Sequence, residues 1–301
     1  MKEVFRMDVR TMQYFLAVIR DGTISAAAES LHIAQPSLSR QMKELEEELG
    51  VSLFERGNRR ITLTEEGRVF RRRAEEMVQL MQLTREEISS VKDNLGGTIR
   101  IGAGESQAFH YLSRTASSLS REYPAIRFAV VSGDTQDLMD ELGHGLIDFA
   151  LVFSKVDGTL FQSITLPVPD VFGVLMRRDD ALAGKDCIHL KDLIERPVII
   201  TRGAEGSLRG RKDFSGLRII ATYNLVYNAS LMVEDGLGVA LCFDKLINTS
   251  GDSPLVFKPL LPEFKVTGNL VWKKYEVISP VVELFISRMQ QMTMQDPVDV
   301  K

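Results

Sequence analysis

The chain has 301 residues, a length that predicts two or more globular domains, and its 37 Lys or Arg against 41 Asp or Glu give a formal net charge of −4. Its four histidines are not at metal-ligand spacing, its two cysteines form no Cys-x-x-Cys motif, and it has no Gly-x-Ser-x-Gly, P-loop or dinucleotide fingerprint, so we expect no enzyme, metal or cofactor. The lack of an apolar signal segment or a membrane-length apolar run favours a cytoplasmic protein with no membrane partner.

The first predicted helix has one apolar face, because Met12, Phe15, Leu16 and Ile19 recur at helical spacing. Asp21-Gly22 is expected to end it. A short alanine-rich helix over residues 26–31 follows, for which Ser25 is the predicted N-cap.

A third helix is predicted over residues 35–49, and it separates apolar from polar positions. Leu38, Met42, Leu45 and Leu49 fall on one side, and the opposite side carries Pro36, Ser39, Arg40 and Lys43. Pro36 suits the first helical position. Two short helices joined by a tight turn, the second with a polar outer face, are the pattern of a helix-turn-helix.

Residues 53–64 predict a hairpin, because Gly57-Asn58 separates two short alternating runs. This wing carries three arginines. Lys and Arg do not outnumber Asp and Glu over residues 7–64, so DNA binding is inferred from where the cations point, against the alternative of an ordinary solvated helix face. We predict base-edge contacts for the outer helix face and phosphate or minor-groove contacts for Lys43 and the wing. The predicted DNA-binding residues are Gln35, Pro36, Ser37, Ser39, Arg40, Lys43, Arg56, Arg59 and Arg60.

One long helix is predicted beyond Thr64, ending near residues 94–97. Apolar residues recur in steps of four and three, which is the spacing of a coiled-coil seam, and Thr84 weakens it without breaking it. The alternative is packing on its own domain, since Leu80 and Leu83 widen the stripe. The residues assigned to dimerisation are Phe70, Ala74, Met77, Met81 and Ile88.

Strands and helices alternate over residues 97–301, which predicts a parallel α/β sheet in two lobes with two crossings and a cleft between them. The first set comprises strands at 98–103, 127–132 and 148–153 with helices from about 106 and at 136–142. The second comprises strands at 171–176, 198–201, 217–222 and 239–243 with a helix near 229–235. The chain is expected to return to the first lobe at 268–273 and to finish with a helix at 280–292.

The loops after these strands are candidate ligand contacts, because helix N-termini at the carboxyl edge of a sheet present unpaired N–H groups. Arg202 is expected to pair with an anionic effector or with an acid such as Glu205, whereas Glu105 argues against a carboxylate ligand. The alternative for Ser106 and Thr135 is that both are helix caps. The predicted effector-binding residues are Ser106, Gln107, Thr135, Thr201, Arg202 and Asn228.

Residues from Met7 to Gly67 resemble the winged helix-turn-helix domain of the LysR-type transcriptional regulators. The resemblance rests on three runs in order: Gln-Pro-Ser-Leu-Ser-Arg, Leu-Gly-Val-Ser-Leu-Phe-Glu-Arg and Leu-Thr-Glu-Glu-Gly. It implies a multidomain architecture: an all-α winged helix-turn-helix with a long linker helix, then an α/β two-lobed domain like periplasmic solute-binding proteins. It also implies that Ser106, Thr135 and Thr201 match positions that commonly meet the inducer.

The expected domains are therefore a DNA-binding domain at 7–64, a linker and dimerisation helix at 65–96, and an effector domain at 97–301, with lobe I at about 97–165 and 268–301 and lobe II at about 166–267. The expected function is sequence-specific transcription regulation controlled by a small-molecule inducer. The expected partners are double-stranded DNA with a dyad operator, RNA polymerase and further copies of the chain in a homodimer or homotetramer. The alternative is a small-molecule sensor whose N-terminal domain only oligomerises.

Overall fold

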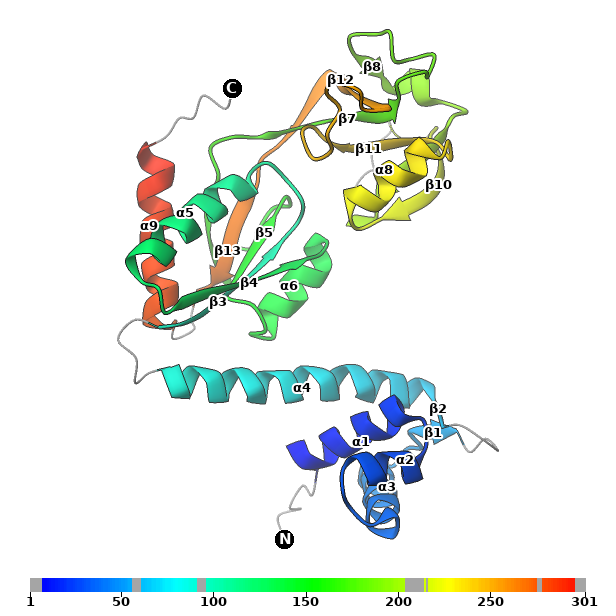
Figure 1. The fold of residues 1–301 in the computed structure, drawn as a ribbon, viewed down its shortest axis with the longest axis vertical. Helices are drawn as coiled ribbons and strands as arrows, with labels where there is room; N and C mark the ends of the chain where they lie inside the picture. Colours follow the sequence, from blue (N-terminus) through cyan, green and yellow to red (C-terminus); the bar gives the residue numbers. More distant parts are fainter. Residues whose placement is uncertain are drawn as a thin grey trace. The chain divides into compact units, whose positions relative to one another are not determined.

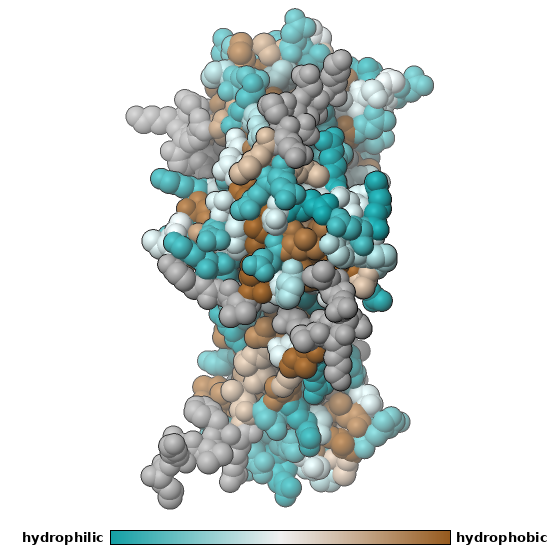
Figure 2. Space-filling view, turned by 90° about the vertical axis from the view of Figure 1, so that its left-hand side faces the viewer, coloured by the Kyte–Doolittle hydropathy of each residue, from teal (hydrophilic) through white to brown (hydrophobic). Residues whose placement is uncertain are grey.

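The computed structural model describes residues 7–55, 61–90, 96–203, 214, 216–274 and 278–295. The chain packs as two units, Met1–Ser90 and Val91–Lys301 (Figure 1). In the described residues no helix is long and apolar enough to cross a membrane. On the face drawn in Figure 2, apolar and polar side chains are interspersed.

Three helices open the first unit: α1 (Val9–Asp21), α2 (Ile24–Ser30) and α3 (Gln35–Leu49). Gly22 ends α1 in the left-handed region, with φ of 74°, as the Asp21-Gly22 pair predicted. The predicted cap of α2 is wrong. Thr23, in an extended conformation, accepts from the Ala26 N–H at 3.1 Å, whereas Ser25 already lies inside the helix.

The predicted hairpin forms between β1 (Phe54–Glu55) and β2 (Thr62–Leu63), which pair antiparallel. The turn that joins them lies outside the described residues. After it, α4 (Glu65–Ser90) runs as one long helix. Its first turn passes close to the residue before β1, since a Cβ at Gly67 would lie 2.1 Å from the Leu53 carbonyl oxygen.

The first turns of α4 belong to the core of their own unit. Phe70 and Ala74 are buried there, and the Phe70 ring packs edge-on against Phe15 with ring centroids 4.8 Å apart. Their assignment to a seam with a second chain was therefore wrong. The alternative of packing on the same domain holds for this part of α4, and Met77, Met81 and Ile88 remain exposed.

The second unit contains a five-stranded sheet in the order β4-β3-β5-β13-β6. Its β3 strand is parallel to β4 and β5, and β13 returns from the far end of the chain to pair antiparallel with β5 and β6. Helices α5 and α9 pack on one face of the sheet and α6 on the other (Figure 1). The bounds are β3 (Gly97–Ala103), α5 (Phe109–Glu122), β4 (Ile126–Ser132), α6 (Thr135–Gly143), β5 (Phe149–Val152), β6 (Phe161–Thr165), β13 (Asn269–Lys273) and α9 (Pro280–Gln295).

A six-stranded sheet in the order β10-β9-β11-β7-β12-β8 forms the rest of the unit. Its β9 strand is parallel to β10 and β11, whereas β7 runs antiparallel to both β11 and β12. The bounds are β7 (Asp170–Arg177), β8 (Ile188–His189), the 3-10 helix η1 (Leu190–Leu193), β9 (Pro197–Thr201), β10 (Arg218–Tyr223), α8 (Val226–Glu234), β11 (Val239–Phe243) and β12 (Leu255–Val266).

The chain passes between the two sheets twice, and the two crossings lie side by side. Asp170 at the start of β7 pairs in register with Val266 at the end of β12. Just beyond, the Leu166 N–H donates to the Gly268 carbonyl at 2.9 Å. The two sheets are therefore joined through adjacent segments, and below we call them the first and second lobes.

Candidate functional site

The two faces of α3 are divided as its sequence predicts. Leu38, Met42 and Leu45 are buried against the core of the first unit. On the other side, the Arg40 and Lys43 side chains are 76% and 70% exposed. Gln35 and Pro36 are exposed as well, and Ser37 and Ser39 are half-buried.

The cations on this face are held only loosely by acids of the same helix. Arg40 lies 3.7 Å from Glu44, and Lys43 lies 3.3 Å from Glu47, in both cases one turn along. Ion pairs between such exposed side chains are worth about 0.3–0.5 kcal/mol, so they yield easily to a stronger anion. The wing arginines Arg56, Arg59 and Arg60 lie outside the described residues.

Glu46 has a role that the sequence did not predict. Its Oε1 accepts hydrogen bonds from the N–H groups of Leu53 (2.6 Å) and Phe54 (3.2 Å). Because Phe54 begins β1, this carboxylate fixes the start of the wing to the helix that carries Arg40. The sequence feature that could have predicted this role is an acid beside the buried face of α3, followed after Gly50 by a segment whose backbone N–H groups need acceptors.

In the second unit, the predicted effector-binding loops lie at the carboxyl ends of parallel strands. Ser106 and Gln107 follow β3, and Thr135 follows β4. The last residues of β3 and β4 pair with each other in register. In the second lobe, Thr201 ends β9 and Arg202 comes directly after it. Asn228 lies in the first turn of α8 and is exposed.

Arg202 links the two lobes. Its Nε donates to Asp134 Oδ2 at 2.6 Å, and its Nη2 pairs with Asp137. Burial acts to raise the pKa of Asp134, but the hydrogen bonds from the Asp137 N–H and Arg202 outweigh it and leave that pKa lowered. Of the two partners expected for Arg202, Glu205 lies outside the described residues, and these acids of α6 take its place.

The alternative prediction, that Ser106 and Thr135 are helix caps, is wrong for both residues. Asp134, not Thr135, is the N-cap of α6 and accepts from the Gln136 and Asp137 N–H groups at 3.1 Å. Asp is among the strongest N-caps, so the sequence held the signal. Ser106 is not the N-cap of α5, which starts later, but its buried hydroxyl accepts from the Ala108 N–H at 3.0 Å within the preceding loop.

Two acids outside the predicted effector-binding set contact the same region. Asp170 is buried, with 4% of its surface exposed, and its Oδ1 accepts from the Gln107 N–H at 2.8 Å. Burial raises its pKa, and its Oδ2 has no hydrogen-bond partner among the described residues. Glu105 reaches the second lobe, where its Oε2 accepts from the Val226 N–H at 2.5 Å.

Further contacts bring the lobes together at these strand ends. The Gln107 side-chain amide donates to the Lys245 carbonyl at 3.0 Å. The Phe153 ring, just after β5, packs against Phe243 at the end of β11 with centroids 5.1 Å apart. The predicted residues Gln107 and Arg202 therefore both make contacts between the lobes.

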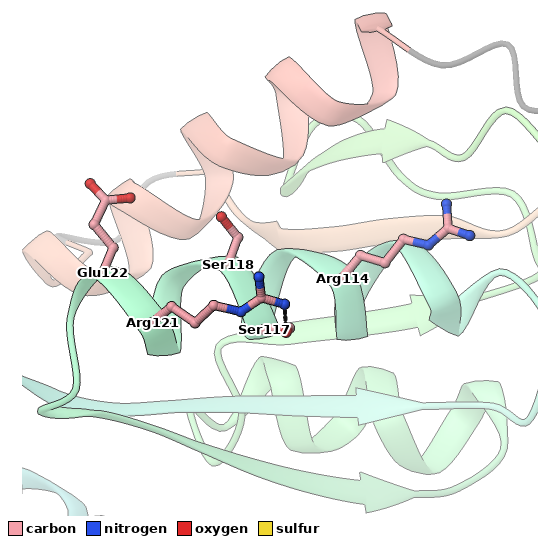
Figure 3. A pocket seen from close by; sticks show the side chains of 5 residues that line it. All are labelled: Arg114, Ser117, Ser118, Arg121 and Glu122. Atoms are coloured by element: carbon pink, nitrogen blue, oxygen red, sulfur yellow. Dashed lines mark hydrogen bonds between the residues drawn. The ribbon is translucent and has the colours of Figure 1, made fainter.

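A pocket of about 500 Å³ lies elsewhere, on the outer face of α5 (Figure 3). Arg114 and Arg121 line it two turns apart, and Arg121 donates to Ser117 Oγ at 3.0 Å. No predicted site residue lines it. Among the described residues, no group of three or more His, Cys, Asp or Glu side chains is placed to hold a metal ion.

Comparison with known families and structures agrees with this architecture. The model described as "Bacterial regulatory helix-turn-helix protein, lysR family" matches residues 9–68, and "LysR substrate binding domain" matches residues 92–293. The transcriptional regulator BsdA of Bacillus subtilis is 34% identical over 202 residues, which are 66% of this chain and 69% of BsdA.

Solved structures share the fold over nearly the whole chain. CbnR, a LysR family transcriptional regulator, superposes with a TM-score of 0.73 at 18% identity, covering 95% of this chain and 99% of CbnR. Full-length CbnR in complex with its target DNA gives a TM-score of 0.72 at 19% identity, covering 95% of this chain and all (100%) of that one.

Proposed function

The chain belongs to the LysR family of DNA-binding transcriptional regulators, and we propose that it reads a dyad operator under the control of a small molecule bound between the lobes of its second unit. We assign DNA binding to residues 7–64, linkage and pairing to 65–96, and effector binding to 97–301. The effector domain divides into lobe I, at about 97–165 and 268–301, and lobe II, at about 166–267.

The division of α3 into a buried and a cationic face carries this proposal. With Leu38 and Met42 in the core, Arg40 faces outward and is free to reach a base edge in the major groove, where an arginine pairs bidentately with guanine. Lys43 meets phosphate. We propose base-edge or nearby contacts for Gln35, Pro36, Ser37, Ser39 and Arg40, and phosphate or minor-groove contacts for Lys43, Arg56, Arg59 and Arg60.

Pairing of two chains is proposed along the later turns of α4. Met77, Met81 and Ile88 are 37%, 38% and 68% exposed, which is unusual for apolar side chains on one helix. A groove of about 830 Å³ between α1 and α4 is lined by Leu16, Met81 and neighbouring residues. A second chain that covers this groove would set two α3 helices at a fixed spacing, as a dyad operator requires.

A homotetramer needs a second interface, and the edges of the two sheets in the second unit offer one. Val130 and Val131 on the edge strand β4 are 51% and 42% exposed, and Ile220 on the edge strand β10 is 37% exposed. Exposed apolar edge strands favour association with another chain. We propose that these edges join dimers into tetramers.

For the effector we propose the strand-end loops that carry Ser106, Gln107, Thr135, Thr201, Arg202 and Asn228. A ligand shifts the lobes only if it binds one arrangement better than another. Since Gln107 and Arg202 already make contacts between the lobes, a ligand there exchanges these contacts for its own. The changed arrangement then alters the spacing of the two half-sites and the contact with RNA polymerase, in the cytoplasm.

The test is a gel-shift titration of the full chain on the DNA upstream of its own gene, with scrambled duplex as competitor. Arg40→Ala should lower both affinity and discrimination, because it removes a base contact, whereas Lys43→Ala should lower affinity for all sequences and flatten the salt dependence. Arg114→Ala, on α5 of the second unit, is the control. A wild-type chain that forms no salt-sensitive specific complex contradicts the proposal and favours the sensor alternative.

A further inference from the structure

Glu105 joins the two lobes at the N-terminus of α8. It lies in the loop between β3 and α5 of the first lobe, and its Oε2 accepts from the Val226 N–H at the start of α8 in the second lobe, at 2.5 Å. The N-cap of α8, Leu225, provides no side-chain hydrogen bond. The first turn of α8 is therefore served by a carboxylate 121 residues away in sequence.

A helix N-terminus presents unpaired N–H groups and a partial positive charge, and both favour an anion. The same two properties hold the carboxylate or phosphate of a ligand. In this chain the position at Val226 is taken by Glu105, so an external anion could bind there only by displacing a carboxylate of the protein.

The loop that carries Glu105 is fixed on both sides. Before it, the Gly104 N–H donates to the Leu151 carbonyl at 3.2 Å. After it, the Gln107 N–H donates to the buried carboxyl of Asp170 at 2.8 Å, and the Ser106 hydroxyl holds the Ala108 N–H. Glu105 is thus presented by an ordered turn, so its backbone loses little further conformational entropy when its side chain meets α8.

A cation at these strand ends, Arg202, is likewise paired with carboxylates of the chain. Arg202 is paired with both Asp134 and Asp137 from the first lobe. Asp170 adds a further buried carboxyl with one oxygen unpartnered among the described residues. The chain's own carboxylates therefore already occupy Arg202 and the α8 N-terminus, two groups that attract anions.

We propose that Glu105 is a specificity-determining residue of the effector region: its carboxylate fills the anion position at the N-terminus of α8, so that effectors bind without directing a carboxylate or phosphate there. The inference rests on the proposed effector role of residues 97–301. Because the protein places carboxylate acceptors at this edge, we expect the effector to present hydrogen-bond donors there, such as hydroxyl or amino groups.

The experiment replaces the carboxylate and asks whether a free one takes its place. Thermal unfolding of the full chain is followed by the fluorescence of Trp272, the single tryptophan, which lies on β13 of the second unit. The probe is sodium formate, compared with sodium chloride at the same concentration. The variants are Glu105→Ala, Glu105→Gln and the control Glu263→Ala, which removes an exposed acid of β12 paired with Lys265.

Glu105→Ala should lower the unfolding midpoint by about 2–4 °C, and formate should recover part of that loss in a saturable way, because it enters the vacated position. Glu105→Gln should lose less and gain nothing from formate, since its amide oxygen still fills the position. Wild type and Glu263→Ala should respond equally to formate and chloride.

A wild-type chain that formate stabilises as strongly as Glu105→Ala would show that the anion position is open, and would overturn the proposal. Equal midpoints and equal formate responses in wild type and Glu105→Ala would overturn it too. If Glu105→Ala does not fold, Glu105→Gln and wild type decide the question. A saturable formate effect on either of these two chains contradicts the proposal. A lowered unfolding midpoint for Glu105→Gln, with no formate effect on either chain, supports it. None of these readings involves DNA, so failure of the proposed regulatory function, seen as loss of specific DNA binding by the wild type, is distinguished from them.

Discussion

Replacing Glu46 tests whether the wing is held to α3 by a single carboxylate. In the structure one oxygen of Glu46 receives two backbone donors, from Leu53 and Phe54. Glu46→Ala leaves both N–H groups without this acceptor, whereas Glu46→Gln keeps an oxygen in place but removes its charge. The two substitutions therefore separate the loss of the acceptor from the loss of the charge.

The expected magnitude follows from the two hydrogen bonds. A hydrogen bond to a charged group contributes about 1.5–3 kcal/mol, and because both donors share one oxygen and are only partly buried, we expect Glu46→Ala to destabilise the first unit by about 2–3 kcal/mol. Glu46→Gln should cost about half as much. The control is Glu47→Ala: Glu47 is 64% exposed and pairs with Lys43, so its removal should cost less than about 0.5 kcal/mol.

The assay is urea unfolding of the full chain with two probes. Far-UV circular dichroism reports the helices of both units, whereas Trp272 reports the second unit alone. Glu46→Ala should lower the midpoint of the part of the dichroism transition that belongs to the first unit and leave the tryptophan transition where it is. Equal destabilisation of the first unit by Glu46→Ala and Glu47→Ala would show that the Glu46 hydrogen bonds do not hold the wing to α3.

Two further predictions concern the second unit and the pairing of chains. Because burial raises the pKa of Asp170, its contribution to stability is full below the ordinary value of 3.8 and is lost as pH rises through the folded-state pKa. The stability of Asp170→Asn relative to wild type should therefore increase as pH rises above 3.8. A difference in urea unfolding that does not change with pH would contradict this. Met81→Glu should reduce the mass of the full chain measured by sedimentation. Leu160 is 59% exposed and lies outside the proposed interfaces, so Leu160→Glu should leave the mass unchanged. An unchanged mass for Met81→Glu would show that α4 is not part of the pairing surface.

Local periodicity and punctuation predicted most of the elements, because these signals depend on neighbouring residues alone. The helix α3 runs from Gln35 to Leu49 as predicted, and the return of the chain to the first sheet occurs at β13. Short or irregular strands such as β8, and the long β12 with its shift of register between Pro259 and Phe264, carry no period that a short window detects.

Contacts between residues far apart in the sequence could not be predicted from the sequence pattern. The seven-residue spacing from Phe70 onward fits both a coiled-coil seam and a helix docked on its own core, and the ring of Phe15 decides for the core at Phe70. In the second unit, the loops were located from strand ends, but the pairing of Arg202 with Asp134 depends on how two separately folded sheets meet. No local rule gives that geometry.

The most direct test of the account is selection of binding sites by the full chain from a random duplex library, in parallel with Arg40→Ala. We predict that wild type enriches an inverted repeat whose half-sites are about one helical turn or a multiple of it apart, and that Arg40→Ala loses the enrichment at one base pair of each half-site. Enrichment of no sequence by the wild type, or the same inverted repeat selected equally well by Arg40→Ala, would contradict it.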